Sequence, residues 1–160
     1  MGNPEYTIDT CSLVIGWSVY PPDIFPGLWS NLEALIQKGM LRATEEVLEE
    51  LRKKDDELLK WAKRQDGFFV PIDLLLQQQV RKVLSDFPSL YDLEKNKSGA
   101  DPFVIAQALQ FGYTIVTEEK KSGNPIKPKI PNVCDAYGIK HINLLALLRE
   151  QGTKLMSTNS

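Results

Sequence analysis

Three acidic residues in this chain stand where carboxylates can meet at one site. Asp9 follows the short apolar run 6–8, Asp101 precedes an apolar helical segment, and Glu119 follows the β-rich run 113–116. Side chains just past the carboxyl ends of parallel strands line the ligand crevice of an open α/β sheet. The spacing therefore predicts an acid-lined crevice.

A fourth acid, Glu50, joins them from a helix. At ~100° per residue, Glu50 lies about 60° from Val47, at the edge of the apolar stripe, whereas Glu49 points roughly the opposite way. Glu50 is the helix acid best placed to face a crevice beside the core, and Glu46, one turn earlier on the same side, is the second choice.

Each of these acids also has a purely structural interpretation. Asp9 fits a turn former, and Asp101, followed by Pro102 at the first helical position, fits a helix N-cap. Glu50 fits a solvated surface acid and Glu119 a loop acid. A capping role and metal ligation do not exclude each other.

Together, the four carboxylates would raise one another's pKa values, and a divalent cation removes that cost. With oxygen ligands alone, Mg²⁺ and Mn²⁺ are favoured over zinc. Such ions act on phosphate oxygens and activate water. Cys11 and Cys134 are too few and too far apart for a zinc site or a disulfide scaffold, and His141 is the chain's single histidine, which excludes a histidine pair.

Size and composition bound the remaining possibilities. The chain has 160 residues and a net charge of −2, which suits one domain over 1–150 and leaves nucleic-acid binding to local patches. Residues 151–160 are polar and are expected to be a disordered tail. No apolar run is long enough to span a membrane, and the N-terminus lacks the pattern of a signal peptide. A cytoplasmic location is expected.

Apolar periodicity predicts alternating strands and helices. Strands are expected over 6–8, 40–43, 68–70, 113–116 and 139–142, and helices over 25–38, 44–66, 74–87, 102–111, 132–137 and 143–149. Residues 10–12 are expected to turn into the apolar segment 13–15. Alternation of this kind implies an α/β fold in three layers, with a mostly parallel sheet of about five short strands between helices.

Four sequence blocks, taken in order, carry a resemblance to a known family. YTIDTCSL, ATEEVLEEL, GADPFVIAQA and TIVTEE begin at residues 6, 43, 99 and 114. They resemble the motif blocks of the PIN-domain ribonucleases, which include the VapC-like toxins of toxin–antitoxin pairs. The block IPNVCDAYGI at 130–139 and the helix containing Trp29 are similar to a stand-alone PIN-like subgroup of largely unassigned function.

The resemblance implies roles for the four acids. The family's first acid falls on Asp9, its helix glutamate on Glu50, its third acid on Asp101, and its fourth on Glu119, where the family usually has aspartate. The first, third and fourth would hold Mg²⁺ or Mn²⁺ directly or through water, and Glu50 would position the attacking water or a second ion. Because glutamate is longer than aspartate, Glu118 remains an alternative at the fourth corner.

Further residues and partners follow from the same resemblance. Thr10 and Thr117 are secondary candidates beside the acids. The loop after Glu119 is rich in lysine and proline, and its lysines would contact the RNA backbone: Lys120, Lys121, Lys127 and Lys129. An RNA substrate, a cognate antitoxin and a homodimer are the implied partners.

Three functions are compared with these residues. The first is a metal-dependent endoribonuclease, a hydrolase of RNA phosphodiester bonds acting as a toxin. The second is a catalytically weak or inactive PIN-like module that binds RNA or protein through the loop 120–131. The third, a phosphoacceptor domain, is disfavoured because residues 9–11 read Asp-Thr-Cys, whereas such domains need an adjacent acidic pair or an Asp-x-Asp sequence.

Overall fold

A single five-stranded sheet lies at the centre of the molecule. The structure is a computed structural model that describes residues 5–95 and 99–152. All neighbouring strands are parallel, in the order β3-β2-β1-β4-β5. The strands are β1 (Tyr6–Ile8), β2 (Leu41–Thr44), β3 (Phe69–Val70), β4 (Thr114–Val116) and β5 (His141–Ile142). The predicted α/β fold class is confirmed.

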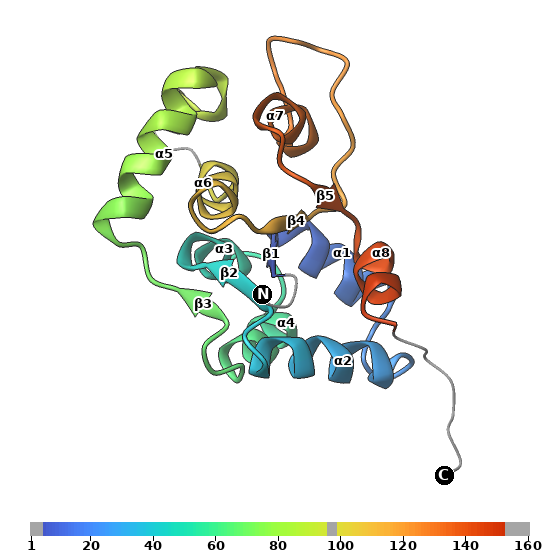
Figure 1. Cartoon of the computed structure of the whole chain (residues 1–160). Coiled ribbons are helices and arrows are strands. Elements are labelled where there is room, and N and C mark those ends of the chain that lie inside the picture. The colour runs from blue at the N-terminus through green and yellow to red at the C-terminus, as the bar shows by residue number, and fades with distance from the viewer. Residues whose placement is uncertain (1–4, 96–98, 153–160) are drawn as a thin grey trace.

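Helices cover both faces of this sheet (Figure 1), with α5, α6 and α7 on one side and α1, α2, α4 and α8 on the other. The α-helices are α1 (Thr10–Val19), α2 (Pro26–Gln37), α3 (Glu45–Leu51), α4 (Asp56–Lys63), α5 (Leu74–Asp86), α6 (Asp101–Phe111), α7 (Ile130–Tyr137) and α8 (Leu144–Glu150), with a 3₁₀ turn, η1, over Pro88–Leu90. Side chains of both layers are needed to bury a parallel sheet, and the strand residues Ile8, Leu41 and Ile115 are fully buried.

The central position of β1 decides where the acids meet. β1 pairs with β2 on one side, Thr7 opposite Arg42, and with β4 on the other, Thr7 opposite Ile115. The carboxyl ends of these three strands therefore lie at one edge. Asp9 follows β1, α3 follows β2, and Thr117 follows β4.

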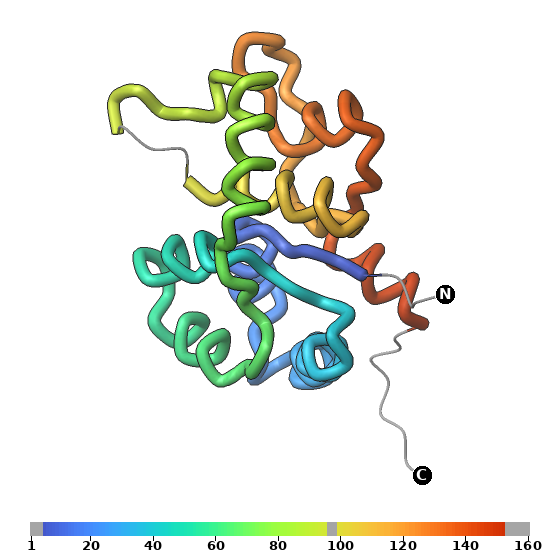
Figure 2. Tube along the Cα trace, turned by 60° about the vertical axis from the view of Figure 1, so that its left-hand side comes forward, coloured from blue at the N-terminus to red at the C-terminus, as the bar shows by residue number. Residues whose placement is uncertain are grey.

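The two ends of the described chain are joined beside β1. The Tyr6 hydroxyl donates to the Glu150 carboxylate at 2.9 Å and accepts from the Gln151 amide at 2.9 Å. Figure 2 shows α8 beside the start of β1. These bonds lie at the amino-terminal end of β1, whereas Asp9 lies at its carboxyl-terminal end.

The segment after Asp9 differs from the prediction. It forms helix α1, not a turn into an apolar segment. The helix is apolar on almost every side, so its sequence has no polar face from which helical periodicity could be recognised. Packing explains why this segment is helical. The centroid of the Trp17 ring lies 4.8 Å from that of Trp29 in α2 and 6.3 Å from that of Trp61 in α4.

The long helix predicted over 44–66 is also wrong, because it is two helices. α3 ends at Leu51, and α4 begins after Asp55, whose carboxylate accepts the backbone N–H groups of Glu57 and Leu58. A capping side chain at this position satisfies the first N–H groups of a new helix.

Two further predictions concern the C-terminal tail and membrane-spanning segments. The tail predicted over 151–160 lies outside the described residues from 153 onwards. Within residues 5–95 and 99–152, no helix has the length and apolar character needed to cross a membrane.

Candidate functional site

Asp9 is the buried centre of the site. Its side chain is 2% exposed and caps α1, with Oδ1 accepting the Ser12 backbone N–H at 2.8 Å. Oδ2 accepts a hydrogen bond from the Thr117 hydroxyl at 2.5 Å, and the Thr117 oxygen in turn accepts the Glu119 N–H at 3.0 Å. Thr117 thus ties the end of β1 to the end of β4.

Glu50 reaches the same edge from α3. Oε1 accepts from the Thr10 hydroxyl at 2.5 Å, and Oε2 accepts the backbone N–H of Ala100 at 3.3 Å. Gly99 lies against the Glu50 side chain and has a φ of +73°. A Cβ at this position would lie 3.1 Å from Glu50 Oε2, which is a tight contact. The half-buried Glu50 and exposed Glu49 match the predicted helix face. Glu46, also half-buried, lies on the same side of α3.

Asp101 occupies the first turn of α6 without capping it. The N-cap is Ala100, and no side chain caps this helix end. The predicted N-cap role of Asp101 is therefore wrong. Among the residues the structure describes, none donates a hydrogen bond to its half-buried carboxylate, which leaves its two oxygens available to a ligand.

The two glutamates after β4 point to different helices. Glu118 accepts the Leu144 N–H at the start of α8 at 2.8 Å, and Glu119 accepts the Ile130 N–H at the start of α7 at 3.1 Å. Glu119 is the one whose charge acts on Asp9 and Asp101. As the fourth acid of the predicted site, Glu119 is favoured over Glu118 by this geometry.

The pKa values report how closely the carboxylates gather. Burial raises the pKa of Asp9 from 3.8 to about 6, against the lowering effect of its hydrogen bonds from Thr117 and Ser12, and Glu119 adds to the rise. Burial also raises the pKa of Asp101 to about 7, with further increases from Glu119, Asp9 and Glu50. The other three predicted acids therefore lie within electrostatic reach of Asp101.

The donor set suits a hard cation. Within the described part of the chain, no group of three or more Asp, Glu, His or Cys side chains is arranged to hold a metal ion. Like charges repel, so Asp9, Glu50 and Glu119 each turn to a protein donor instead. A Mg²⁺ or Mn²⁺ ion between Asp9 and Asp101 would offset the cost of ionising them, and carboxylate oxygens are the ligands these ions prefer.

The environment of Cys11 does not favour a cysteine nucleophile at this site. Burial raises the pKa of the neighbouring Cys11 thiol to about 11, and Asp9 and Glu119 add to the rise. A thiol with this pKa is protonated at neutral pH and is a poor nucleophile. Cys11 and Cys134 are both free, and His141 is engaged by Asp135 at 3.2 Å, outside the acid cluster.

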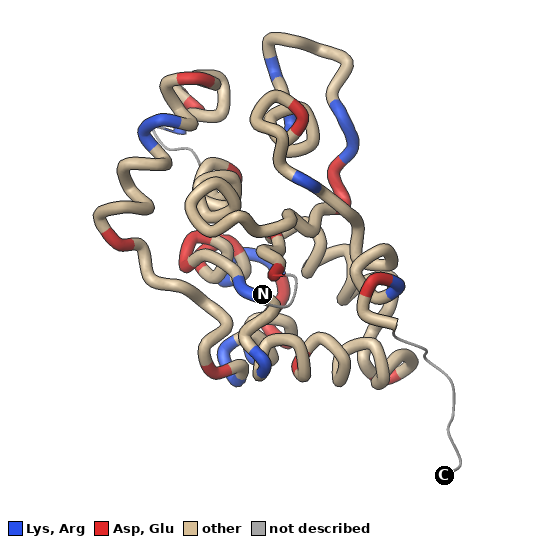
Figure 3. The backbone as a smooth tube through the Cα atoms, viewed as in Figure 1, with Lys and Arg blue, Asp and Glu red and all other residues tan. Residues whose placement is uncertain are grey.

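Basic residues flank the acids on the loop between β4 and α7, as Figure 3 shows. Lys129 is the predicted RNA-binding lysine whose charge lowers the pKa of Asp101. Lys121 is turned to Asp135, with 2.5 Å between Nζ and Oδ2. Lys120 and Lys127 are exposed on the same loop.

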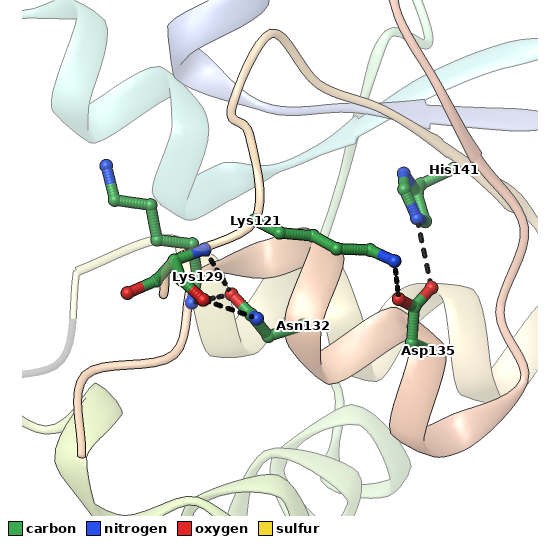
Figure 4. A network of polar contacts seen from close by, with 6 residues as sticks. Lys121, Lys129, Asn132, Asp135 and His141 are labelled. Carbon is green, nitrogen blue, oxygen red and sulfur yellow. Dashed lines mark hydrogen bonds and ion pairs between the residues drawn. The ribbon is translucent and has the colours of Figure 1, made fainter. Parts of the chain in front are cut away.

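Asn132 is a site residue that the sequence interpretation missed. Its Oδ1 accepts the backbone N–H groups of Ser122 at 2.8 Å and Lys129 at 2.9 Å, and its Nδ2 donates to the Ser122 carbonyl at 3.1 Å. Figure 4 shows Asn132 between Lys121 and Lys129. One side chain therefore clamps both ends of the loop. The available signal was an asparagine at the first position of the helix predicted over 132–137, after a long polar loop.

Replacing Asn132 with alanine is expected to free the loop. Three hydrogen bonds to the backbone are lost, which costs roughly 1–3 kcal/mol, and trypsin should cleave the loop lysines faster than in the native protein. Asn124→Ala is the matched control, because Asn124 accepts only within the loop, from Ile126 at 3.0 Å. Equal digestion rates for the two variants would contradict the clamp.

Comparison with known proteins agrees with this architecture. A family model described as "Domain of unknown function (DUF4411)" matches residues 6–155. The chain belongs to the DUF4411 family. A comparison with curated proteins finds no match to this DUF4411 chain.

A solved structure is similar in fold. It is described as the crystal structure of DNA-bound VapBC from Salmonella typhimurium, and its TM-score with this DUF4411 chain is 0.53 at 12% identity. The match covers 89% of this chain and 99% of the other. The DUF4411 chain thus has a PIN-like fold, as the motif blocks predicted.

Proposed function

We propose that this protein is a Mg²⁺- or Mn²⁺-dependent endoribonuclease that acts as the toxin of a toxin–antitoxin pair. The observation that carries the proposal is the pair of carboxylates, the buried Asp9 and the half-buried Asp101, at the carboxyl edge of a PIN-like sheet, both with raised pKa values. Structural roles alone do not explain Asp101, since it caps no helix end. A site built to receive a cation explains both carboxylates.

Each acid has a distinct task in this proposal. Asp9, Asp101 and Glu119 would hold the cation, which when bound polarises the scissile phosphate and lowers the pKa of water. The pKa of Asp101 is raised to about 7, and its carboxylate would be ionised when it holds the cation. Glu50, oriented by the Thr10 hydroxyl and the Ala100 N–H, positions the attacking water.

The remaining residues orient the site and the RNA. Thr117 holds the Asp9 carboxylate in place, and Lys129 offers a positive charge to the phosphate backbone beside Asp101. Lys120, Lys121 and Lys127 extend this charge along the loop. The VapBC likeness in fold supports an antitoxin partner for this chain, and a homodimer is a further expectation.

Cleavage of a mixed pool of single-stranded RNA tests the proposal. We expect cleavage with Mg²⁺ or Mn²⁺, loss of cleavage in EDTA, and recovery when Mn²⁺ is added in excess. Cleavage that continues unchanged in EDTA would contradict the metal mechanism, and no cleavage with either ion would contradict the enzymatic one.

A second candidate is a PIN-like module that binds RNA or protein without cutting. The observation in its favour is that the Glu119 carboxylate is occupied by the Ile130 N–H at the start of α7. Calorimetry with Mn²⁺ separates the two functions. A nuclease takes up the ion at the acids and loses that uptake in Asp101→Asn, whereas a binding module has no need to take it up.

A further inference from the structure

The Glu119 carboxylate lies between the other acids and the start of α7. Its Oε2 accepts the Ile130 backbone N–H at 3.1 Å. Among residues 5–95 and 99–152, no hydrogen bond or ion pair engages its other oxygen, Oε1. A carboxylate has acceptor sites on both oxygens, so one oxygen can hold the helix while the other binds a second group.

Hydrogen bonds also join the backbone of Glu119 to Asp9. The Glu119 N–H donates to the Thr117 hydroxyl oxygen at 3.0 Å, and the same hydroxyl donates to Asp9 Oδ2 at 2.5 Å. After burial, the charge of Glu119 is the largest cause of the raised pKa of Asp101, and it adds to the rise at Asp9. Glu119 therefore lies within electrostatic reach of both aspartates that would hold the cation.

The first turn of α7 depends on the contact with Glu119. Lys129, at the N-cap, makes no side-chain cap bond, and Pro131 has no N–H to be satisfied. Ile130 is fully buried, so its N–H would have no partner without the Glu119 carboxylate. Because an unpaired buried N–H is costly, this contact helps to fix where the helix begins.

The same end of α7 carries the loop between β4 and α7, here called the lysine-rich loop. Lys129 is the last loop residue before Ile130, and its charge partly offsets the rise in the pKa of Asp101 that burial and the carboxylates cause. Asn132 accepts the backbone N–H groups of Ser122 and Lys129, at 2.8 and 2.9 Å. A shift of the first turn of α7 would therefore move both ends of the loop.

Glu119 can serve a cation in two ways, and the structure favours one of them. If Oε2 turned from α7 to the cation, the buried Ile130 N–H would be left unpaired. If Oε1 served the cation, the bond to Ile130 would be kept. Losing a partner at a buried donor costs the full desolvation penalty of that group, so the second arrangement is the less costly.

We infer that Glu119 couples the cation site to the lysine-rich loop, with Oε1 serving the cation and Oε2 holding the first N–H group of α7. This inference rests on the proposed function, because it needs a cation at Asp9 and Asp101. Coupling between two sites is reciprocal. A bound cation would therefore stabilise the start of α7, and an ordered start of α7 would favour the cation.

Amide hydrogen exchange at Ile130 measures this coupling without RNA and without cleavage. Isotope-labelled protein is titrated with Mg²⁺ and followed by NMR, and the amide signals of Asp9 and Ser12 report whether the ion reaches the acids. Exchange at Ile130 requires the start of α7 to open locally. We expect saturating Mg²⁺ to slow this exchange roughly 5- to 150-fold, the usual range of coupling between two sites.

Glu119→Asp shortens the side chain by one methylene, so its carboxylate can no longer serve the cation and the Ile130 N–H together. Mg²⁺ should still shift the Asp9 signal but should no longer slow exchange at Ile130. Glu118→Asp is the matched control, because Glu118 holds the Leu144 N–H of α8 in the same way, at 2.8 Å. This control should keep the native response of Ile130 to Mg²⁺. Thermal melts confirm that each variant folds.

The outcomes separate the coupling from the catalytic proposal. If Mg²⁺ shifts the Asp9 signal and leaves exchange at Ile130 unchanged, the coupling is overturned and the nuclease proposal stands. Faster exchange in Mg²⁺ would mean that Glu119 leaves α7 for the ion, which also overturns the coupling. A native response in Glu119→Asp, or a lost response in Glu118→Asp, would contradict it as well. No shift at Asp9 would overturn the cation site itself, and the coupling with it.

Discussion

Replacing Asp9 with asparagine is expected to slow RNA cleavage by on the order of 1,000-fold while making the metal-free protein more stable. A cation at an active site contributes several kcal/mol to transition-state charge stabilisation. Losing about 4 kcal/mol of it corresponds to roughly three orders of magnitude in rate. The neutral amide is a far weaker ligand than the carboxylate.

The expected gain in stability comes from the burial of the Asp9 carboxylate. In the folded protein the pKa of Asp9 is about 6, compared with an ordinary value of 3.8, so ionised Asp9 costs about 3 kcal/mol at neutral pH. Asparagine keeps an oxygen for the Ser12 N–H and carries no charge. We expect the melting temperature in EDTA to rise by roughly 6–12 °C.

Asp66→Asn is the control for charge alone. Asp66 is exposed between α4 and β3, so this variant should melt and cleave RNA as the native protein does. An Asp9→Asn protein that is inactive and also less stable would mean that the carboxylate holds the fold together rather than a cation.

The second large effect is a pH-dependent response of stability to divalent cations. Asp9 and Asp101 have raised pKa values, about 6 and about 7. Folding therefore favours their protonated forms. Their stabilising contribution is fully present below their ordinary pKa values and is lost as the pH rises through 6 and 7. Metal-free protein should become less stable between pH 5 and pH 8.

At lower pH, other acids oppose this trend. Hydrogen bonds and charges from Lys82 and Tyr137 lower the pKa of Asp86, and Lys121 and His141 lower that of Asp135. Stability contributed by such groups is lost as the pH falls through their lowered pKa values. The melting temperature in EDTA should therefore pass through a maximum near pH 4, close to the ordinary aspartate pKa of 3.8.

Mn²⁺ should prevent the loss of folding stability that accompanies a rise in pH. The ion binds ionised carboxylates, so a saturating concentration should raise the melting temperature at pH 7.5 and have little effect at pH 5. Scanning calorimetry at both pH values, with and without Mn²⁺, measures the difference. The double variant with Asp9→Asn and Asp101→Asn should show a flat response, and a Mn²⁺ effect that persists in it would place the ion elsewhere.

The acids were found in the sequence because local position already constrains them. Asp9 follows a strand, Asp101 opens a helix with Pro102, and the helical repeat separates Glu50 from Glu49. The helix α1 and the break before α4 were missed for different reasons. An all-apolar helix has no periodic signal, and the cap at Asp55 was hidden within a continuous run of charged residues.

Sequence by itself determined the alternation of strands and helices and the order of the four acids along the chain. Tertiary structure decided which way each carboxylate turns. Glu118 and Glu119 are adjacent in sequence, yet they cap different helices, because the N-termini of α8 and α7 converge there from elsewhere in the fold.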